Sequence, residues 1–316
     1  MALFFLAPLV GEFLLGNLPI TFLAALMLLA PLYGGGAILI RETARRFDFT
    51  WTGIVILGLA YGVIEETFVT QSLFNPNYIG LRLLDYGYIP ALGMSAWWTV
   101  FVLSLHTIWS TAVPIAMMET LSVRQRRTPW LGRVGLVITT VLFLAGCAIL
   151  MRFEYKKGFI ASPAQFIGSA VAVGGLIALA FGIGRNKPGV KRAVGVGNPP
   201  TPLRVGLTAF TFGAAFFALM KAKKSLPPTP IVAGMVVLWA AAAALNLMWS
   251  RRIGWREKHR LALTAGFLLT YTWYGFVQVP SVGNVSAKVA LIGNVIFATG
   301  AVLLLWKAIS VVKREG

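Results

Sequence analysis

Two adjacent glutamates, Glu65 and Glu66, lie inside the apolar run 52–74 of a 316-residue chain that has only 10 acidic residues. An ionisable side chain at the centre of a membrane costs about 2.5–3.5 kcal/mol on insertion scales, so it suggests a function. Two neighbouring carboxylates repel each other at low dielectric, which favours a proton on at least one of them. A buried carboxyl that takes up and releases a proton suits a general base or a proton carrier.

Helical spacing gives the two glutamates different surroundings. Steps of four residues place Gly58, Gly62, Glu66 and Thr70 on one helix face. The two glycines form a GxxxG pattern that lets another helix approach closely, so Glu66 is expected to face a packed neighbour. Glu65 lies about 100° around the helix and is expected to tune Glu66 or to hydrogen-bond with it. The alternative is that Glu66 is a protonated structural residue that bonds across the helix interface.

His106 is the third residue that could take part in chemistry. It lies about 12 Å below Trp98, which is expected to mark the outer membrane interface, if each helical residue rises 1.5 Å. Glu66 lies about 22 Å above Trp51 by the same count, and the hydrocarbon core is about 30 Å thick. The residues should therefore meet at one level in a cluster of Glu65, Glu66 and His106. The alternative is a lone histidine bonded to a carbonyl or hydroxyl.

The same three residues match the ligand count of a catalytic zinc site. Adjacent glutamates on an α-helix point about 100° apart, however, so they should not converge on one ion. The sequence therefore leaves the metal unknown and predicts no cofactor. Glu12, in the apolar run 2–16, is a further carboxylate that could reach the same level.

The remaining ionisable residues have simpler interpretations. Glu42 and Glu119 are expected to form exposed ion pairs with Arg45 and Arg124 at helix ends. His259 lies in a basic loop and is expected to be solvated. The polar residues of one long loop are expected to form turns first, and to contact a substrate second: Asn75, Asn77 and Asp85.

The elements that carry these residues are long apolar runs. The chain is 58% hydrophobic and 12% charged, whereas soluble domains carry about 25% charged residues. We predict an all-α polytopic transmembrane helix bundle of 9–10 spans. The run 2–16 reaches only about 22 Å, so it either tilts or re-enters. The apolar runs are 2–16, 19–41, 52–74, 90–121, 134–151, 163–183, 205–220, 230–249, 261–278 and 289–306.

Charge predicts the orientation. Of the 28 Lys and Arg residues, 20 fall in one set of alternating loops and 8 in the other. The positive-inside rule places the richer set, and the C-terminus, in the cytoplasm. Loop orientation explains the net charge of +18 without nucleic acid, so the expected partner is the lipid bilayer of a bacterial plasma membrane. The loop 184–204 is rich in Gly, Pro and basic residues and is expected to be mobile. The single cysteine, Cys147, is expected to be a small apolar residue in a helix.

The polar residues suggest two parts. The apolar runs before residue 152 contain all the membrane-depth glutamates and the histidine. We therefore predict an N-terminal helical bundle, 1–152, that carries the Glu/His site. A C-terminal bundle, 153–316, is expected to be mostly apolar.

The stretch GLAYGVIEETFVTQSLF, residues 58–74, followed by a histidine about 40 residues on, resembles the CAAX protease and bacteriocin-processing (CPBP) family of intramembrane proteases. The resemblance implies Glu65 or Glu66 as base for a water, with His106 binding that water or the oxyanion. It also implies a membrane-embedded peptide or protein substrate. The chain departs from the family at Thr70, where an arginine is expected, and at Val102, where a phenylalanine is expected. No later apolar run contains the family's second histidine.

Three functions stay open. The leading prediction is a divergent CPBP-type peptidase, active or degenerate. The second is a proton-coupled transporter, which predicts a central pathway lined by both halves. Pro31 with Gly34 to Gly36, or Pro114, could supply the helix kinks that favour it. The third is a non-catalytic scaffold whose basic loops bind a partner or anionic lipid.

Overall fold

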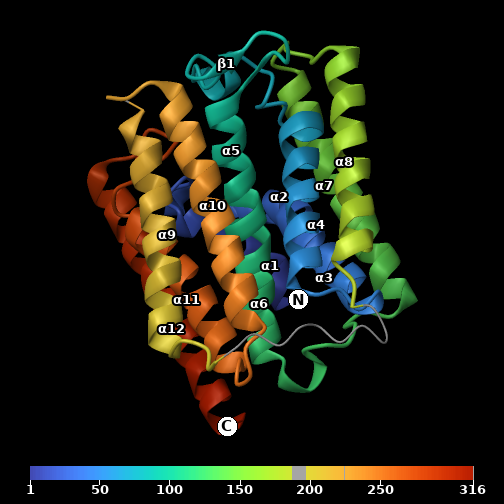
Figure 1. The fold of residues 1–316 in the computed structure, drawn as a ribbon. Helices are drawn as coiled ribbons and strands as arrows, with labels where there is room; N and C mark the ends of the chain where they lie inside the picture. The colour runs from blue at the N-terminus through green and yellow to red at the C-terminus, as the bar shows by residue number, and fades with distance from the viewer. Residues whose placement is uncertain (187–196, 224, 316) are drawn as a thin grey trace.

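The structure is a computed structural model that describes residues 1–186, 197–223 and 225–315. Figure 1 shows an almost entirely helical bundle. Its α-helices are α1 (Ala2–Pro8), α2 (Leu26–Leu29), α3 (Gly35–Arg46), α4 (Trp51–Ile64), α5 (Ala96–Ser104), α6 (Val113–Leu121), α7 (Arg133–Tyr155), α8 (Pro163–Ile183), α9 (Pro202–Ala222), α10 (Pro228–Ser250), α11 (Glu257–Tyr274) and α12 (Ala287–Glu315).

Several helices continue through turns of another helical type. The π-helical segments are η1 (Leu9–Leu14), η3 (Ala30–Gly34), η4 (Glu65–Val69) and η6 (Leu105–Ala112). The 3₁₀ segments are η2 (Ile20–Ala25), η5 (Tyr78–Gly80) and η7 (Val123–Gln125). Two short strands are present in the described residues, and they pair as an antiparallel hairpin: β1 (Tyr88–Ile89) and β2 (Met94–Ser95).

The predicted all-α membrane bundle is confirmed. Within the described residues, 8 helices are long and apolar enough to cross a membrane, and Ala2–Leu14 is a shorter apolar helix. Three of the long helices run through π-helical turns without a break: Ile20–Arg46, Trp51–Val69 and Ala96–Leu121. The prediction of 9–10 spans also counted α11 and the segment Ala2–Leu14, which are not among these 8 helices.

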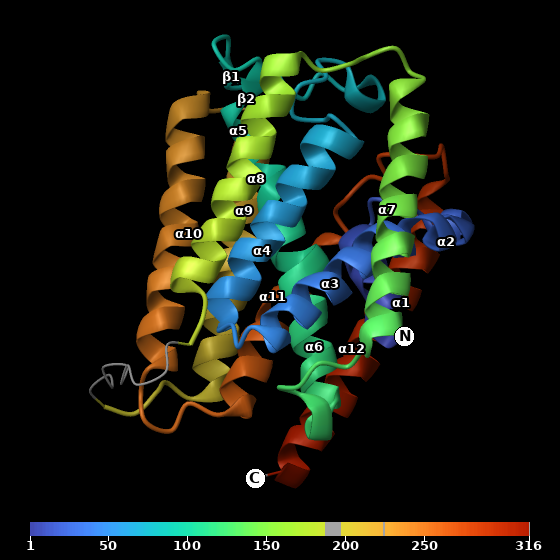
Figure 2. The same ribbon diagram turned by 90° about the vertical axis from the view of Figure 1, so that its right-hand side faces the viewer.

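The central helix is the one that carries His106. In the helix Ala96–Leu121, 72% of the most apolar 18-residue stretch is buried. In the helix Trp51–Val69, the corresponding share is 67%. The share falls to 11% in each of α7, α8 and α10, so these helices present their apolar side chains to the surroundings. Figures 1 and 2 show these three helices at the edge of the bundle. The polar residues therefore lie where neighbouring helices exclude lipid.

Helices of the two halves flank the central one. Figure 1 shows α4, α7 and α8 on one side of α5 and α6, and α9, α10 and α12 on the other. α8 packs along α4, and α9 packs along α11. The predicted division into residues 1–152 and 153–316 stays a prediction, with α8 packed against the first of these parts.

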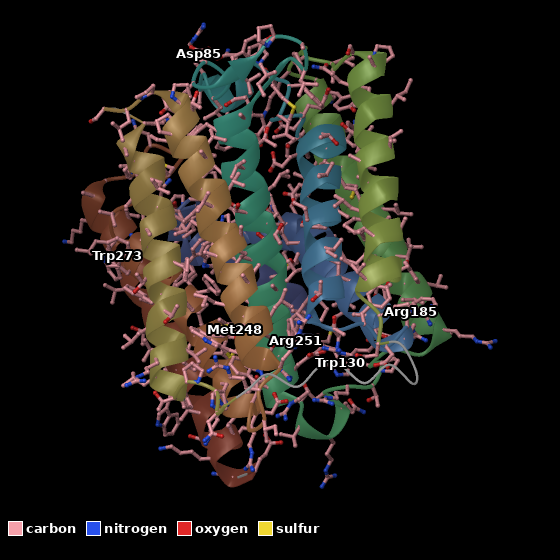
Figure 3. All side chains as sticks on the ribbon, in the orientation of Figure 1. Asp85, Trp130, Arg185, Met248, Arg251 and Trp273 are labelled. Carbon is pink, nitrogen blue, oxygen red and sulfur yellow. The ribbon has the colours of Figure 1, made fainter. Side chains whose placement is uncertain are left out.

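The loops alternate between the two ends of the bundle. Figure 3 shows Asp85 at one end, and Trp130, Arg185 and Arg251 at the other, where the C-terminus also lies. The positive-inside rule assigns this second end to the cytoplasm, and the term cytoplasmic end is used for it below. The predicted mobility of the loop 184–204 falls largely on residues 187–196, which lie outside the described residues.

The expectation of exposed ion pairs at Glu42 and Glu119 is wrong. Both carboxylates are buried, with 0% and 1% of their surface exposed. Glu119 binds Arg45 (Nε–Oε1 2.6 Å) and Arg41 (Nε–Oε1 3.2 Å), while Glu42 binds Arg41 (Nη1–Oε1 2.9 Å). Trp130 covers the pair from the following loop, with its ring 3.6 Å from the Arg41 guanidinium carbon. Burial follows because α3 and α6 meet under this loop.

His259 is also buried rather than solvated, with 4% of its surface exposed. Its Nδ1 accepts the backbone N–H of Arg256 at 3.1 Å, and its ring stacks on Trp255. It therefore closes the first turn of α11. In the outer loop, Asn75 accepts the backbone N–H of Asn77 at 3.0 Å, which confirms its role as a turn former.

Candidate functional site

Glu65, Glu66 and His106 converge on one point in the bundle interior. The His106 ring lies between the two carboxylates, with Nε2 2.7 Å from Glu66 Oε1 and Nδ1 3.2 Å from Glu65 Oε2. All three side chains are at least nine-tenths buried. Their predicted meeting is confirmed, and the alternative of a lone histidine is wrong. Their catalytic role stays a prediction.

The two adjacent glutamates reach the same imidazole because their turn is π-helical. A π-helix closes i→i+5 hydrogen bonds, so it holds more residues per turn and rotates each successive side chain by less than an α-helix does. One ligand atom from each of Glu65, Glu66 and His106 lies within 4.8 Å of the others. The expectation that the glutamates would diverge is therefore wrong, and two carboxylates with an imidazole are a donor set that suits a divalent cation.

Small residues on α4 allow the histidine to come this close. A Cβ atom on Gly62 would lie 3.0 Å from the Cβ of His106, and one on Gly58 would lie 2.5 Å from the hydroxyl of Thr111. The predicted close approach at the GxxxG face is confirmed. The same face ends at Thr70, whose hydroxyl donates to Glu66 Oε2 at 3.1 Å.

A hydroxyl that sequence reasoning missed completes the environment of Glu66. Ser72 donates its hydroxyl to Glu66 Oε2, and the indole N–H of Trp98 donates to Ser72 Oγ at 3.0 Å. Ser72 faces back toward the helix because Gln71 takes a left-handed conformation, with φ 56°, just after the helix ends. A polar Gln-Ser pair at the end of an apolar run was the available signal.

Glu12 approaches the cluster from the other side. Its carboxylate accepts hydrogen bonds from the Tyr33 hydroxyl and the Asn17 amide, each at 2.5 Å. The Tyr33 ring packs on His106, with ring centroids 5.8 Å apart. Tyr61 packs on another side of His106 at 6.0 Å, and its buried hydroxyl has no hydrogen-bond partner among the described residues. The two tyrosines were not predicted as site residues.

The three glutamates, the histidine and Tyr33 of this region stand on π-helical segments. Glu12 lies in η1, Tyr33 in η3, Glu65 and Glu66 in η4, and His106 in η6. π-helical turns make up well under 1% of residues in globular proteins and are frequent at functional sites. Prolines lie in or near three of the four: Pro8 precedes η1, Pro31 lies within η3, and Pro114 follows η6 by two residues. Because proline has no N–H, it breaks the i→i−4 pattern and favours such turns.

The arrangement can hold a proton. Among the described residues, no Lys or Arg forms an ion pair with Glu12, Glu65 or Glu66. The imidazole hydrogen-bonds Glu66 through Nε2, and Glu65 Oε2 lies 3.2 Å from Nδ1 without a hydrogen bond, so the site can hold a proton between His106 and Glu66. The buried negative charge of the cluster therefore requires protons or a bound cation for compensation.

A large groove lies on the other side of the central helix. It has a volume of about 910 Å³ and is mostly apolar. Its walls come from α4, from α5 through η6 to α6, and from α9, α10 and α11. Figure 1 shows α4 and α10 on opposite sides of α5 and α6. Thr107 lines the groove, and its neighbour His106 belongs to the cluster, so one helix separates the two features.

This fold defines a multi-pass helical membrane protein with a buried Glu/His cluster and a groove between its halves. The chain belongs to a family described as "Uncharacterized membrane protein family", whose model matches residues 1–314. It is also similar to the vitamin B12 import system permease protein BtuC of Vibrio cholerae, with 25% identity over 164 residues. The match covers 51% of this chain and 43% of the relative, so the chain spans less than half of that protein's length. No solved structure matches the chain.

The resemblance to CPBP proteases is wrong. Neither the matching family nor the permease relative points to that group. The structure gives a physical reason for the misleading motif. Thr70 hydrogen-bonds Glu66 where the protease pattern places an arginine. Helices α9 to α12 bring no histidine or carboxylate to the cluster, since His259 lies at the cytoplasmic end of α11.

Proposed function

We propose that the protein is a proton-coupled permease of the bacterial plasma membrane, with the groove as its substrate pathway. The observation that carries the proposal is the groove itself, because helices of both halves line it. A transporter requires such a pathway between two parts that can move against each other. The similarity to a permease supports the same class of function.

The Glu65–His106–Glu66 cluster is the proposed proton site. Intramembrane carboxylates and histidines commonly form the proton relays of transporters. The hydrogen-bonded groups Ser72 and Trp98 extend the cluster on one side. The other titratable groups with an electrostatic effect on the glutamates are Glu12, Tyr33, Tyr61, Tyr78 and Cys147.

The segment η6 couples the two features. His106 faces the cluster from η6, while Thr107 and Ile108 of the same segment line the groove. A proton added to the cluster changes which hydrogen bonds His106 makes. A shift of this helical turn then changes the wall of the groove. Protonation of the cluster is thus a local charge event with a wider conformational result. In this mechanism the proton gradient drives the change in groove access.

Uptake into proteoliposomes tests the proposal. The purified full chain is reconstituted, a pH gradient is imposed, and uptake of a panel of labelled metabolites and lipids is measured with and without an uncoupler. We expect at least one compound to show gradient-dependent uptake that Glu66→Gln abolishes. Glu154→Gln serves as the matched control, because Glu154 pairs with Lys157 away from the cluster.

Two results would contradict the proposal. One is a wild-type protein that moves no compound in response to the gradient. The other is uptake by Glu66→Gln at the wild-type rate, because a proton carrier cannot lose its carboxylate without effect.

A further inference from the structure

We propose that the groove binds an anionic glycerophospholipid, with its phosphate at the cytoplasmic end and an acyl chain along the apolar wall. This inference rests on the proposed function, because it names the substrate class of the same groove. The carrying observations are the length of the groove, its apolar wall and the arginines at one end.

The groove has the shape of an extended amphiphile. Its lining residues on the central helix run from Thr99 to Ala116. These positions are about 25 Å apart along the helix, which is close to the thickness of a hydrocarbon core. The wall between them is formed mainly by apolar side chains such as Leu59, Leu103 and Phe212. A long acyl chain fits this wall without leaving polar groups unsatisfied.

Positive charge gathers at the cytoplasmic end of the groove. Arg45 and Arg260 both approach the ring of Trp51, with their guanidinium carbons 5.9 and 5.8 Å from its centroid. These two arginines also pair with carboxylates, Arg45 with Glu119 and Arg260 with Glu257. Their charges are therefore largely compensated by these carboxylates, and their main contribution to the groove is as hydrogen-bond donors.

Arg127 supplies the uncompensated charge. It lines the groove, is exposed, and makes no ion pair or hydrogen bond with another described residue. The opposing charge at this end is Asp48, which accepts a hydrogen bond from Asn186 at 3.0 Å. The planar guanidinium group matches phosphate oxygens in a bidentate manner. Arg127 and Arg260 are therefore the expected phosphate ligands.

The position of the arginines at the cytoplasmic end of the groove agrees with an anionic lipid of the inner leaflet. Anionic headgroups attract basic protein segments there. Trp249 and Trp255 also line this end, and tryptophans favour the level of lipid headgroups. The combination selects a phosphate-bearing lipid with a net negative charge over a zwitterionic lipid.

Native mass spectrometry of the full chain in detergent tests the inference. Phosphatidylglycerol and phosphatidylcholine with identical acyl chains are titrated against the protein. We expect at least tenfold tighter binding of phosphatidylglycerol. We also expect an approximately tenfold loss with Arg127→Gln or Arg260→Gln, since a charge-assisted hydrogen bond contributes about that factor. Arg124→Gln, an exposed arginine outside the groove, is the matched control and should bind like wild type.

Two additional arms keep the result decisive. Glycerol 3-phosphate should not compete, because it lacks the acyl chain, and Ala242→Trp should lower lipid affinity by filling the groove wall. Equal affinity for the two lipids, unchanged affinity in both arginine variants, or full competition by glycerol 3-phosphate would overturn the inference. The assay uses no pH gradient, so it measures lipid binding separately from gradient-driven uptake. Failed lipid selection overturns the substrate class alone, and failed gradient-driven uptake overturns the permease.

Discussion

At the residue scale, the cluster was largely predictable. The types and depths of Glu65, Glu66 and His106 were sufficient to place them together, because few ionisable groups enter the membrane without a partner. Their geometry was not predictable, since it depends on a π-helical turn that leaves no periodic signal. Ser72 and Tyr33 were missed because their positions depend on tertiary structure. Their contacts follow from chain reversal after the helix and from packing of a distant segment.

Removal of the imidazole is expected to destabilise the protein. His106→Ala leaves two buried carboxylates facing an empty space, and loss of one partner of a buried pair costs about 3–5 kcal/mol. The double variant His106→Ala with Glu66→Gln should recover part of this loss, because it also removes one carboxylate. Thermal unfolding in detergent measures both. Asp85→Asn, which breaks an exposed pair with Arg82, should cost less than about 1 kcal/mol. A double variant no more stable than the single one would argue against electrostatic coupling.

At the element scale, helix existence was predictable and helix interruption was not. Apolar runs and their flanking charges gave the long helices with small errors at the ends. The π-helical segments η1, η3 and η6 could be anticipated only through the prolines at positions 8, 31 and 114, and η4 has no proline to signal it. Close helix contacts depend on glycines whose role appears only once the partner helix is known. Gly34 is the clearest example, because η3 crosses the first helix there.

Gly34→Ala is expected to disrupt the crossing of η3 and α1. A Cβ atom at Gly34 would lie within 1.9 Å of the backbone oxygen of Phe4, and a main-chain atom cannot move aside without shifting its helix. The expected loss is about 1–3 kcal/mol or more, as for other overpacked positions. Gly168→Ala is the matched control, because nothing lies within 4 Å of its Cβ, and it should gain about 0.5–1 kcal/mol. Chemical unfolding of the purified variants compares the two, and equal stabilities would contradict the predicted crossing.

At the scale of the whole molecule, the bundle has a polar cluster and a mostly apolar groove that meet at one helix. The cluster lies on one side of the segment from α5 through η6 to α6, and the groove lies on the other. The sequence predicted a pathway lined by both halves only as one of three functions, because the groove arises from packing between helices far apart in the chain. The buried ion pairs of Glu42 and Glu119 brace the cytoplasmic end of the first half.

The most direct test of the account is charge movement on a pH jump, recorded with the full chain on a solid-supported membrane. Proton entry into a buried cluster moves charge across part of the membrane, so wild type should give a transient current without any substrate. Glu66→Gln and His106→Gln should lose this current, and Glu154→Gln should keep it. A current of wild-type size in Glu66→Gln, or no current in the wild type, would contradict the proton site.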